Sequence, residues 1–232
     1  REAISYLNRK KDNPLEMRES VSPAYPVEEI YGIVSRDTRY PYKVKEIIAR
    51  LIDGSDFHEF KARYGKTLVC GFARLHGYPV GIVANNGILF SDSALKGTHF
   101  IQICNKRNIP LIFLQNVSGF MVGKASENSG IAKDGAKMVT AVAASQVPKF
   151  TVIIGGSFGA GNYAMCGKAY DPRLIFAWPS AQIAVMGGAQ SAKTILQIQT
   201  ATLKSKGKEF TEEEENALLK KITDRYNEQM SA

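Results

Sequence analysis

Short, uniformly apolar stretches recur along the central part of the chain, and each of them ends in a turn of small residues. A strand that is buried on both faces of a sheet has such a continuous apolar run rather than an alternation of apolar and polar positions. The pattern therefore predicts five strands, at residues 67–75, 80–85, 111–115, 151–154 and 174–178.

Stretches with helical periodicity lie between these runs and after the last of them. The expected helices cover residues 93–107, 129–145, 160–168, 190–203 and 212–228. The last one opens with Thr211 and, three residues later, Glu214, which is the pattern of a capping box. Because strands and helices alternate, the sequence predicts crossover connections and an α/β fold class.

Residues 1–66 differ from the rest because prolines interrupt any long element there. Within this stretch, residues 43–52 predict a short amphipathic helix, and residues 57–64 predict a further helical turn. We therefore expect a lead-in segment over residues 1–66 and a folded domain over residues 67–232. The chain begins with Arg1 and has no basic-then-apolar leader, so we interpret it as an internal piece of a longer protein.

The composition narrows the class of protein. Of the 232 residues, 44% are apolar and 22% are charged, which excludes wholesale disorder and is enough for a sizeable core. No run approaches the ~18 consecutive apolar residues of a membrane span, so no membrane partner is expected. Three widely separated cysteines predict a reducing compartment, and three histidines without ligand spacing predict no metal.

The net charge of +8 is concentrated in the middle of the chain, where residues 67–190 contain ten basic and four acidic side chains. A basic surround in this glycine-rich centre favours an anionic ligand or an acidic partner, while a role in solubility alone stays open. Because the basic residues are scattered singly, no nucleic-acid partner is expected.

The most informative motif is the glycine-rich turn at residues 155–163 (GGSFGAGNY), where a strand runs into a helix. Such a turn bares backbone N–H groups at a helix start, and these favour an anion or an oxyanion. Residues 155–159 also fit the GxSxG pattern of esterases, but the histidine base should follow Ser157 and all three histidines precede it. Residues 159–164 fit the GxGxxA dinucleotide fingerprint, but no acidic residue ends the next strand.

Two interpretations of this turn remain. Its main-chain N–H groups form an oxyanion hole, which needs no nucleophile of its own, or its glycines serve only the close packing of strand and helix. Small and apolar residues are also mixed at residues 115–123 and 178–188, after two other strands. In the first of these, Phe120 and Met121 either line an apolar pocket or pack as part of a lid or interface.

A superficial phosphate-loop pattern occurs at Gly65, Lys66 and Thr67. The first glycine of that motif would fall at position 60, which is Phe60, so the phosphate-loop interpretation fails.

Several of these motifs together resemble the carboxyltransferase subunits of biotin-dependent acyl-CoA carboxylases. The resemblance rests on residues 71–74, 79–83, 85–87, 115–123, 130–137, 155–163 and 177–188, which follow one another in order. Within that family, the GGSFGAGNYAMCG form of the turn is most similar to the β subunits of methylcrotonoyl-CoA carboxylases.

The resemblance implies a crotonase/ClpP-like superhelix of β-β-α units. It implies that the chain is the C-terminal domain of the subunit, truncated at its C-terminal end, and that the N-terminal domain with most of the acyl-CoA site lies outside it. The implied reaction moves CO₂ from carboxybiotin to the γ-carbon of 3-methylcrotonoyl-CoA in leucine breakdown. The implied partners are acyl-CoA, a biotin-carrying α subunit and further β subunits, in the mitochondrial matrix or the bacterial cytoplasm.

By the same resemblance, the N–H groups of Ala160 and Gly161 form an oxyanion hole for the biotin ureido oxygen. The residues implied in binding biotin or substrate are Phe158, Gly159, Asn162, Tyr163, Phe120, Met121, Ala184, Val185, Met186, Gly187 and Gly188. Propionyl-CoA carboxylases carry aspartate at the position of Tyr163, which argues against propionyl-CoA as the substrate. Geranyl-CoA stays open, because it is also a 3-methyl-2-enoyl thioester.

Two other classes of function remain as alternatives. A non-catalytic assembly module would use the glycine turns for packing only, and the piece by itself is expected to have little or no carboxylase activity. A crotonase-type hydratase or isomerase would need a carboxylate in its pocket. Asp134 and Asp171 are the nearby acids, and both are interpreted as residues of a helix surface or a turn.

Overall fold

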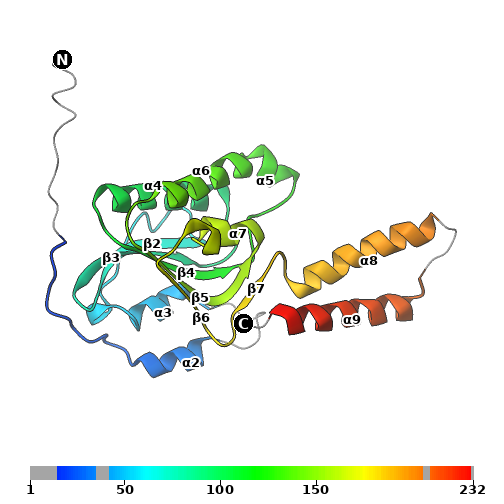
Figure 1. Ribbon diagram of the computed structural model, residues 1–232, viewed down its shortest axis with the longest axis horizontal. Coiled ribbons are helices and arrows are strands. Elements are labelled where there is room, and N and C mark those ends of the chain that lie inside the picture. Colours follow the sequence, from blue (N-terminus) through cyan, green and yellow to red (C-terminus); the bar gives the residue numbers. More distant parts are fainter. Residues whose placement is uncertain (1–14, 35–41, 206–209, 231–232) are drawn as a thin grey trace, which may run out of the picture.

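One mixed sheet forms the centre of the protein, and helices pack on both of its faces (Figure 1). The computed structural model describes residues 15–34, 42–205 and 210–230. Within these residues the sheet has seven strands in the order β1-β2-β3-β4-β5-β6, and β7 pairs with β5 as well. The strands are β1 (His58–Glu59), β2 (Leu68–Leu75), β3 (Tyr78–Asn85), β4 (Leu111–Val117), β5 (Lys149–Phe158), β6 (Leu174–Ala177) and β7 (Gln182–Ala184).

All five predicted strands are present, as β2 to β6. β2 and β3 form an antiparallel hairpin, and β3, β4, β5 and β6 then run parallel to one another. β5 is longer than predicted because it continues through the glycine pair to Phe158, where it pairs with β7. Since the carboxyl ends of parallel strands meet at one edge of a sheet, the turns that follow β3, β4 and β5 lie together.

The helical elements are η2 (Val27–Glu29), α2 (Ile30–Ile33), α3 (Val44–Ala49), η3 (Asp53–Ser55), α4 (Ser91–Lys106), α5 (Lys124–Asn128), α6 (Ile131–Ala144), α7 (Gly159–Ala164), η4 (Lys168–Tyr170), α8 (Gly188–Lys204) and α9 (Glu212–Met230). α4 and α6 lie side by side over one face of the sheet, α3 lies against the other, and α8 and α9 form a hairpin that projects away (Figure 1). No helix among the described residues is both long and apolar enough to cross a membrane.

The helix predictions are confirmed with shifted ends. α6 begins only at Ile131 because Gly130, its N-cap, is left-handed (φ +91°). α7 is shorter than expected and ends at Ala164, shortly before the left-handed Cys166 (φ +59°). The capping box at α9 is confirmed, since Thr211 Oγ1 accepts the Glu214 N–H at 3.3 Å and Glu214 Oε2 accepts the Thr211 N–H at 2.9 Å.

The core has two layers, one on each face of the sheet. One contains Phe100 of α4, Phe113 of β4 and Met138 of α6, all completely buried. The other contains Ile47 and Ile48 of α3, in one cluster with residues of β2, β3, β4 and β5. The expectation of strands buried on both faces is therefore confirmed for the centre of the sheet.

The cysteines belong to this core, as their spacing predicts. Cys70, Cys104 and Cys166 are all free and buried. Burial raises the pKa of the Cys104 thiol to about 12 and that of Cys166 to about 11, so both thiols stay protonated at neutral pH.

The run at residues 174–178 is an exception, because β6 is not buried on both faces. Leu174 is 52% exposed and Phe176 is 53% exposed. β6 lies at the edge of the sheet, where β5 is its one partner among the described strands. The expectation of burial is therefore wrong for β6, whose apolar side chains form part of the surface of this chain.

The helical turn expected at residues 57–64 is also wrong. His58 and Glu59 form β1 instead, paired antiparallel with β2, and the Phe60 N–H donates to the Cys70 carbonyl at 2.8 Å. Gly71 makes this pairing possible, because a Cβ there would lie 2.4 Å from the Phe57 ring. Sheet pairing thus overrides a weak local helical pattern.

An ionic bridge at this edge connects helices from the two faces of the sheet. Glu59 of β1 forms ion pairs with Lys45 of α3 and with Lys96 of α4, the latter at 3.6 Å. The Lys96 side chain is completely buried, and its Nζ has no hydrogen-bond partner among the described residues. Glu59 is therefore the group that compensates this buried charge.

Replacing Glu59 with glutamine should strongly destabilise the protein, because it leaves the Lys96 ammonium buried without a counter-charge. We expect Glu59→Gln to lower the free energy of unfolding by about 3 kcal/mol in equilibrium urea titrations. Glu46→Gln is the control, because Glu46 pairs with Arg50 on the surface, and we expect a loss of no more than about 1 kcal/mol. Equal losses for the two variants would contradict the compensating role of Glu59.

Candidate functional site

The glycine turn lies where β5 passes into α7, between the loop that follows β4 and the end of β7. The first N–H groups of a helix have no acceptor within the helix, and Gly159, Ala160 and Gly161 occupy the first three positions of α7. Ala160 is exposed to solvent and Gly161 is buried. The turn therefore offers backbone donors at the carboxyl edge of the parallel strands, which is the arrangement that the sequence predicts.

Two of these positions need glycine for steric reasons. Gly159 has a left-handed backbone (φ +53°), and a Cβ there would lie 2.9 Å from the Val185 carbonyl oxygen. A Cβ on Gly161 would lie 2.7 Å from the Val117 side chain and 3.1 Å from Gly119 Cα. The main chain of α7 thus packs closely against the loop after β4 and the segment after β7. These two glycines therefore serve close packing, and the oxyanion-hole interpretation stays a prediction.

A chain of buried hydrogen bonds holds α7 against β4. Ser157 Oγ donates to Gln115 Oε1 at 2.6 Å, and Asn162 Nδ2 donates to Ser157 Oγ at 2.7 Å. Gln115 Nε2 in turn donates to the Met165 carbonyl at 2.6 Å, at the other end of α7. Gln115 of the sheet is therefore bonded to the residue before the N-cap of α7, and through it to Asn162, and also to the C-cap Met165.

This network also excludes the esterase interpretation of the GxSxG pattern. Ser157 is completely buried and its hydroxyl proton is directed to Gln115, whereas the nucleophile of an esterase is exposed at its turn and bonded to a histidine. The serine is thus a structural residue of the turn.

Asn116 supports the glycine pair that precedes the turn. The β4–β5 register shifts here, so that residues 154–156 of β5 stand opposite Asn116 alone. The Asn116 side-chain oxygen accepts the Gly156 N–H at 3.0 Å and fills the space where a Cβ on Gly155 would lie, 2.4 Å from it. The Asn116 N–H in turn lies 3.4 Å from the Asn85 side-chain oxygen at the end of β3.

Sequence reasoning missed the supporting roles of these amides, although residues 85–87 and 115–123 were singled out as motifs. The signal was present, because Asn85, Gln115 and Asn116 are polar residues at the ends of otherwise apolar strands. A buried polar residue must find a hydrogen-bond partner, and at strand ends that share an edge these partners are one another's neighbours.

The loop after β4 contains Phe120 and Met121. Leu89 ties it to the turn before α4, since the Leu89 N–H donates to the Gly119 carbonyl at 3.1 Å and the Met121 N–H to the Leu89 carbonyl at 2.9 Å. The Phe120 ring packs on Gly135 of α6, because a Cβ added to Gly135 would lie 3.1 Å from this ring. Phe120 thus packs against the core, and a ligand-lining role for Met121 stays a prediction.

The residues implied on the other side of the turn come from β7 and the start of α8. Pairing of Phe158 with Ala184 places β7 directly beside the turn, and Val185 beyond it is 82% exposed. Met186 is half-buried, Gly187 is the N-cap of α8 and Gly188 begins the helix. These residues are thus brought to the same edge as α7.

Tyr163 points outward from α7. It is 49% exposed, and its ring contacts that of Tyr170 edge to face, at 5.7 Å between centroids. Asn162, the preceding residue, is held inward by its bond to Ser157, so α7 presents the tyrosine and not the asparagine to the surface.

The two acids considered for a hydratase differ in their surroundings. Asp171 is exposed in a left-handed turn (φ +51°), as expected. Asp134 is buried, contrary to its interpretation as a helix-surface residue, because it accepts hydrogen bonds from the Ser91 hydroxyl and, at 2.9 Å, from Lys137 Nζ. These donors, Ser91 first, lower the pKa of Asp134 below its ordinary value. In the described part of the chain, no three His, Cys, Asp or Glu side chains are grouped as a metal site.

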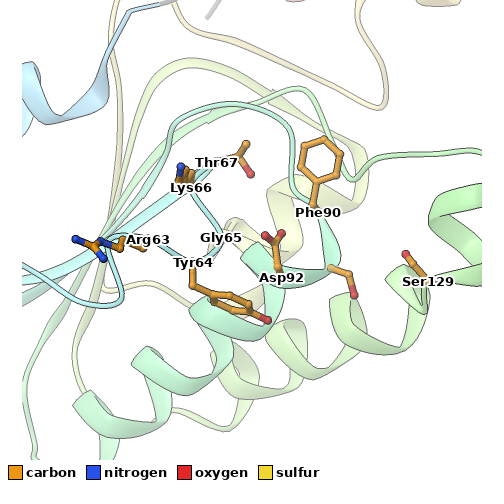
Figure 2. Close-up of a pocket in the computed structure, with 9 residues that line it drawn as sticks. Arg63, Tyr64, Gly65, Lys66, Thr67, Phe90, Asp92 and Ser129 are labelled. Atoms are coloured by element: carbon orange, nitrogen blue, oxygen red, sulfur yellow. The ribbon is translucent and has the colours of Figure 1, made fainter.

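The turn lies outside the two cavities described in this chain. One, of about 540 Å³, is lined by residues 63–67, the start of α4 and Ser129 (Figure 2). The other, of about 530 Å³, lies at the opposite edge of the sheet, beside Arg74 and Pro79. Of the donor residues of the turn, Ala160 is exposed to solvent and Gly161 is buried.

Comparison with known proteins gives consistent results. The "Carboxyl transferase domain" family matches residues 1–232. The chain is 57% identical over 231 residues to "Methylcrotonoyl-CoA carboxylase beta chain, mitochondrial" from Dictyostelium discoideum, covering all of this chain and 39% of that protein. It is 58% identical over 214 residues to the "Biotin-dependent 3-methylcrotonyl-coenzyme A carboxylase beta1 subunit" of Mycobacterium tuberculosis, covering 92% of this chain and 40% of that protein.

Solved structures agree with the fold expected from the resemblance. The geranyl-CoA carboxylase β subunit of P. aeruginosa superposes with a TM-score of 0.85 at 44% identity, over 94% of this chain and 41% of that one. A chain of the transcarboxylase 12S hexamer superposes with a TM-score of 0.80 at 34% identity, over 94% of this chain and 41% of that one. The crotonase-like α/β fold is thereby confirmed. The chain spans about 40% of the length of the relatives it matches.

The lowered pKa of Asp134 makes part of the stability depend on pH. A carboxylate with a lowered pKa in the folded state stabilises the protein above its unfolded pKa of about 4, and this contribution is lost as the pH falls through the folded value. Asp134→Asn should therefore be about 1 kcal/mol less stable than the parent at pH 7, and the difference should shrink below pH ~4. Urea unfolding at several pH values measures this. A difference that grew on acidification would contradict the assignment, and Asp171→Asn serves as the exposed control.

Proposed function

The chain belongs to the carboxyl transferase domain family, and from this membership we propose that it is the carboxybiotin-handling domain of a β subunit of the methylcrotonoyl-CoA carboxylase type. In this proposal, residues 67–232 form the carboxyltransferase C-terminal domain and residues 1–66 lead into it. The reaction is transfer of CO₂ to the γ-carbon of 3-methylcrotonoyl-CoA. The observation that carries the proposal is the high identity to methylcrotonoyl-CoA carboxylase β chains over nearly the whole chain, above that to the geranyl-CoA and transcarboxylase proteins.

The first turn of α7 is the proposed catalytic element. Bound carboxybiotin supplies CO₂, with negative charge developing on its ureido oxygen as the CO₂ leaves. The N–H groups of Ala160 and Gly161 fit such an oxygen, because they have no acceptor within the helix and Ala160 is exposed. Donors held in place before the reaction stabilise this charge without reorganisation, and the Gln115–Ser157–Asn162 network holds them.

The surrounding residues are proposed to shape the binding pocket. Phe158 and Gly159 lead into the donors, and the segment from Ala184 to Gly188 lies beside them through β7. Tyr163 is the residue that we assign to the acyl end of the substrate, because it is exposed next to the donors. No side-chain base is required of this chain in the proposed reaction, because biotin, once it has released CO₂, would accept the proton that leaves the γ-carbon of the thioester. This is consistent with the buried Ser157 and the paired Asp134.

The proposed partners are acyl-CoA, a biotin-carrying α subunit and other β subunits. The exposure of Ala160, Tyr163 and Val185 around the turn supports this, since a pocket that is completed by a second chain or domain leaves part of its lining exposed in a single domain. The proposed location is the mitochondrial matrix or the bacterial cytoplasm, because relatives from both sources have this β-chain type.

Substrate preference tests the proposed reaction. In the complete reading frame, we expect carboxyl transfer to free biotin from 3-methylglutaconyl-CoA to exceed transfer from methylmalonyl-CoA in direct competition. If methylmalonyl-CoA were preferred, the reaction class would still be correct, but the assignment of 3-methylcrotonoyl-CoA as the substrate would be wrong. The carboxylated product of geranyl-CoA is the third competitor, because the structural likeness to a geranyl-CoA carboxylase favours that substrate next. Transfer from none of them would overturn the function.

The oxyanion assignment is tested by removing one donor. Proline is tolerated in the first turn of a helix, so Ala160→Pro should keep the fold while it removes one N–H. We expect kcat for transfer to biotin to fall by about 10²–10³. Ala160→Gly keeps the N–H at the same position and should lose far less activity. If Ala160→Pro kept the full kcat of the parent, the oxyanion assignment would be wrong, and the glycine turn would serve packing only.

A further inference from the structure

The 540 Å³ cavity beside the start of α4 is built by a loop of unusual composition. Residues 61–66 read KARYGK, with three cations and no acid. Figure 2 shows Arg63 and Lys66 on one side of the cavity and Phe90 and Ser129 on the other, with Tyr64 next to the start of α4. The lining therefore combines basic and aromatic side chains.

The loop is held in place by its own backbone and by α4. Gly65 is left-handed (φ +54°), and a Cβ there would lie 2.9 Å from Ser93 Cα, so the loop is pressed against the first turn of the helix. Thr67 Oγ1 lies within hydrogen-bond distance of Ser93 Oγ, at 2.7 Å. Lys61 Nζ lies 5.7 Å from the centre of the Tyr64 ring. The side chains are thus presented by an ordered loop.

The two cations on the rim are not neutralised by the protein. Within the described residues, neither Arg63 nor Lys66 forms an ion pair or a hydrogen bond, and both are exposed. Asp92 also lines the cavity, but its carboxylate accepts the Ser93 N–H at 2.7 Å. Tyr64 and Phe90 add apolar surface, being 41% and 36% exposed. Arginine next to exposed aromatic rings is typical of surfaces that bind another protein.

This rim lies on the same edge of the sheet as the candidate site. The Asn86 N–H at the end of β3 donates to the Thr67 carbonyl at 2.8 Å. The segment that ends in Phe90 is the one that Leu89 ties to Gly119 and Met121, next to α7. A partner that delivers a group to the N–H donors of α7 would therefore pass close to these cations.

We propose that the rim formed by Arg63, Tyr64, Lys66 and Phe90 is the docking surface for an acidic face of the biotin-carrying partner. This inference rests on the proposed function and adds to it the place and the charge of the contact. The positive rim attracts carboxylates of the partner during encounter, and the aromatic rings pack once it is seated. The rim therefore accelerates transfer to or from biotin on its carrier and has no part in the chemistry of free biotin.

The test uses the complete β subunit and the complete biotin-carrying subunit. In Arg63→Glu/Lys66→Glu, kcat/KM for carboxyl transfer from 3-methylglutaconyl-CoA to carrier-bound biotin should fall about ten-fold or more at low salt. Transfer to free biotin should stay within about two-fold of the parent, which also shows that the variant is folded. Added salt should slow transfer to carrier-bound biotin by the parent, and it should reduce the difference in kcat/KM between the parent and the variant.

Lys106→Glu/Arg107→Glu is the matched control, because it reverses two exposed cations at the other end of α4. The proposal would be wrong if the rim variant transferred to carrier-bound biotin as fast as the parent does. It would also be wrong if the control variant lost as much of this activity as the rim variant. A raised KM for the thioester with both acceptors would overturn it too, and would assign the cavity to the phosphates of CoA. If the parent transferred to neither form of biotin, the proposed function itself would fail, which is a different result from a rim effect.

Discussion

Parallel pairing of β4 with β5 is the constraint on which the candidate site depends. The register between these strands shifts once, so that three residues of β5 stand opposite Asn116. Such a bulge bends a strand and changes where its end points, and here it leads directly into α7. The amide of Asn116 takes the place of the side chain that Gly155 lacks and satisfies the Gly156 N–H. Without this register, the N–H groups of the first turn would have no fixed direction.

The chemistry offered by such a site is that of the main chain. Two side chains considered as a nucleophile or a base are already bonded, Ser157 to Gln115 and Asp134 to Ser91 and Lys137. Their role is to hold elements together, and the proposed reactive feature is the pair of N–H groups at Ala160 and Gly161. Because only a change to proline removes a main-chain donor, its support by buried amides is the part of the site that other side-chain changes can perturb.

Several exposed apolar residues lie on the strands that follow the site. Leu174 and Phe176 on β6 and Ile183 on β7 are each close to half exposed. Exposed apolar side chains, where they form a patch, are typical of a contact with another chain or domain. Together with the projecting hairpin of α8 and α9 (Figure 1), it indicates that this part of the fold is arranged around contacts beyond the chain. The polar site and the apolar edge are thus adjacent, as expected where a second chain or domain closes a pocket.

The sequence alone determined the α/β class, the five strands, the principal helices and the position of the glycine turn, because these depend on local periodicity and on glycine at close approaches. It also indicated the family through the order of its motifs. Only the tertiary structure decided that His58 and Glu59 pair as an edge strand, that β6 is exposed, and that Asp134 is buried under Ser91. The same holds for the network of Gln115, Ser157 and Asn162, which joins residues as many as 42 positions apart. Such contacts depend on register and on which strands become neighbours, and neither of these is recorded in the local pattern of the chain.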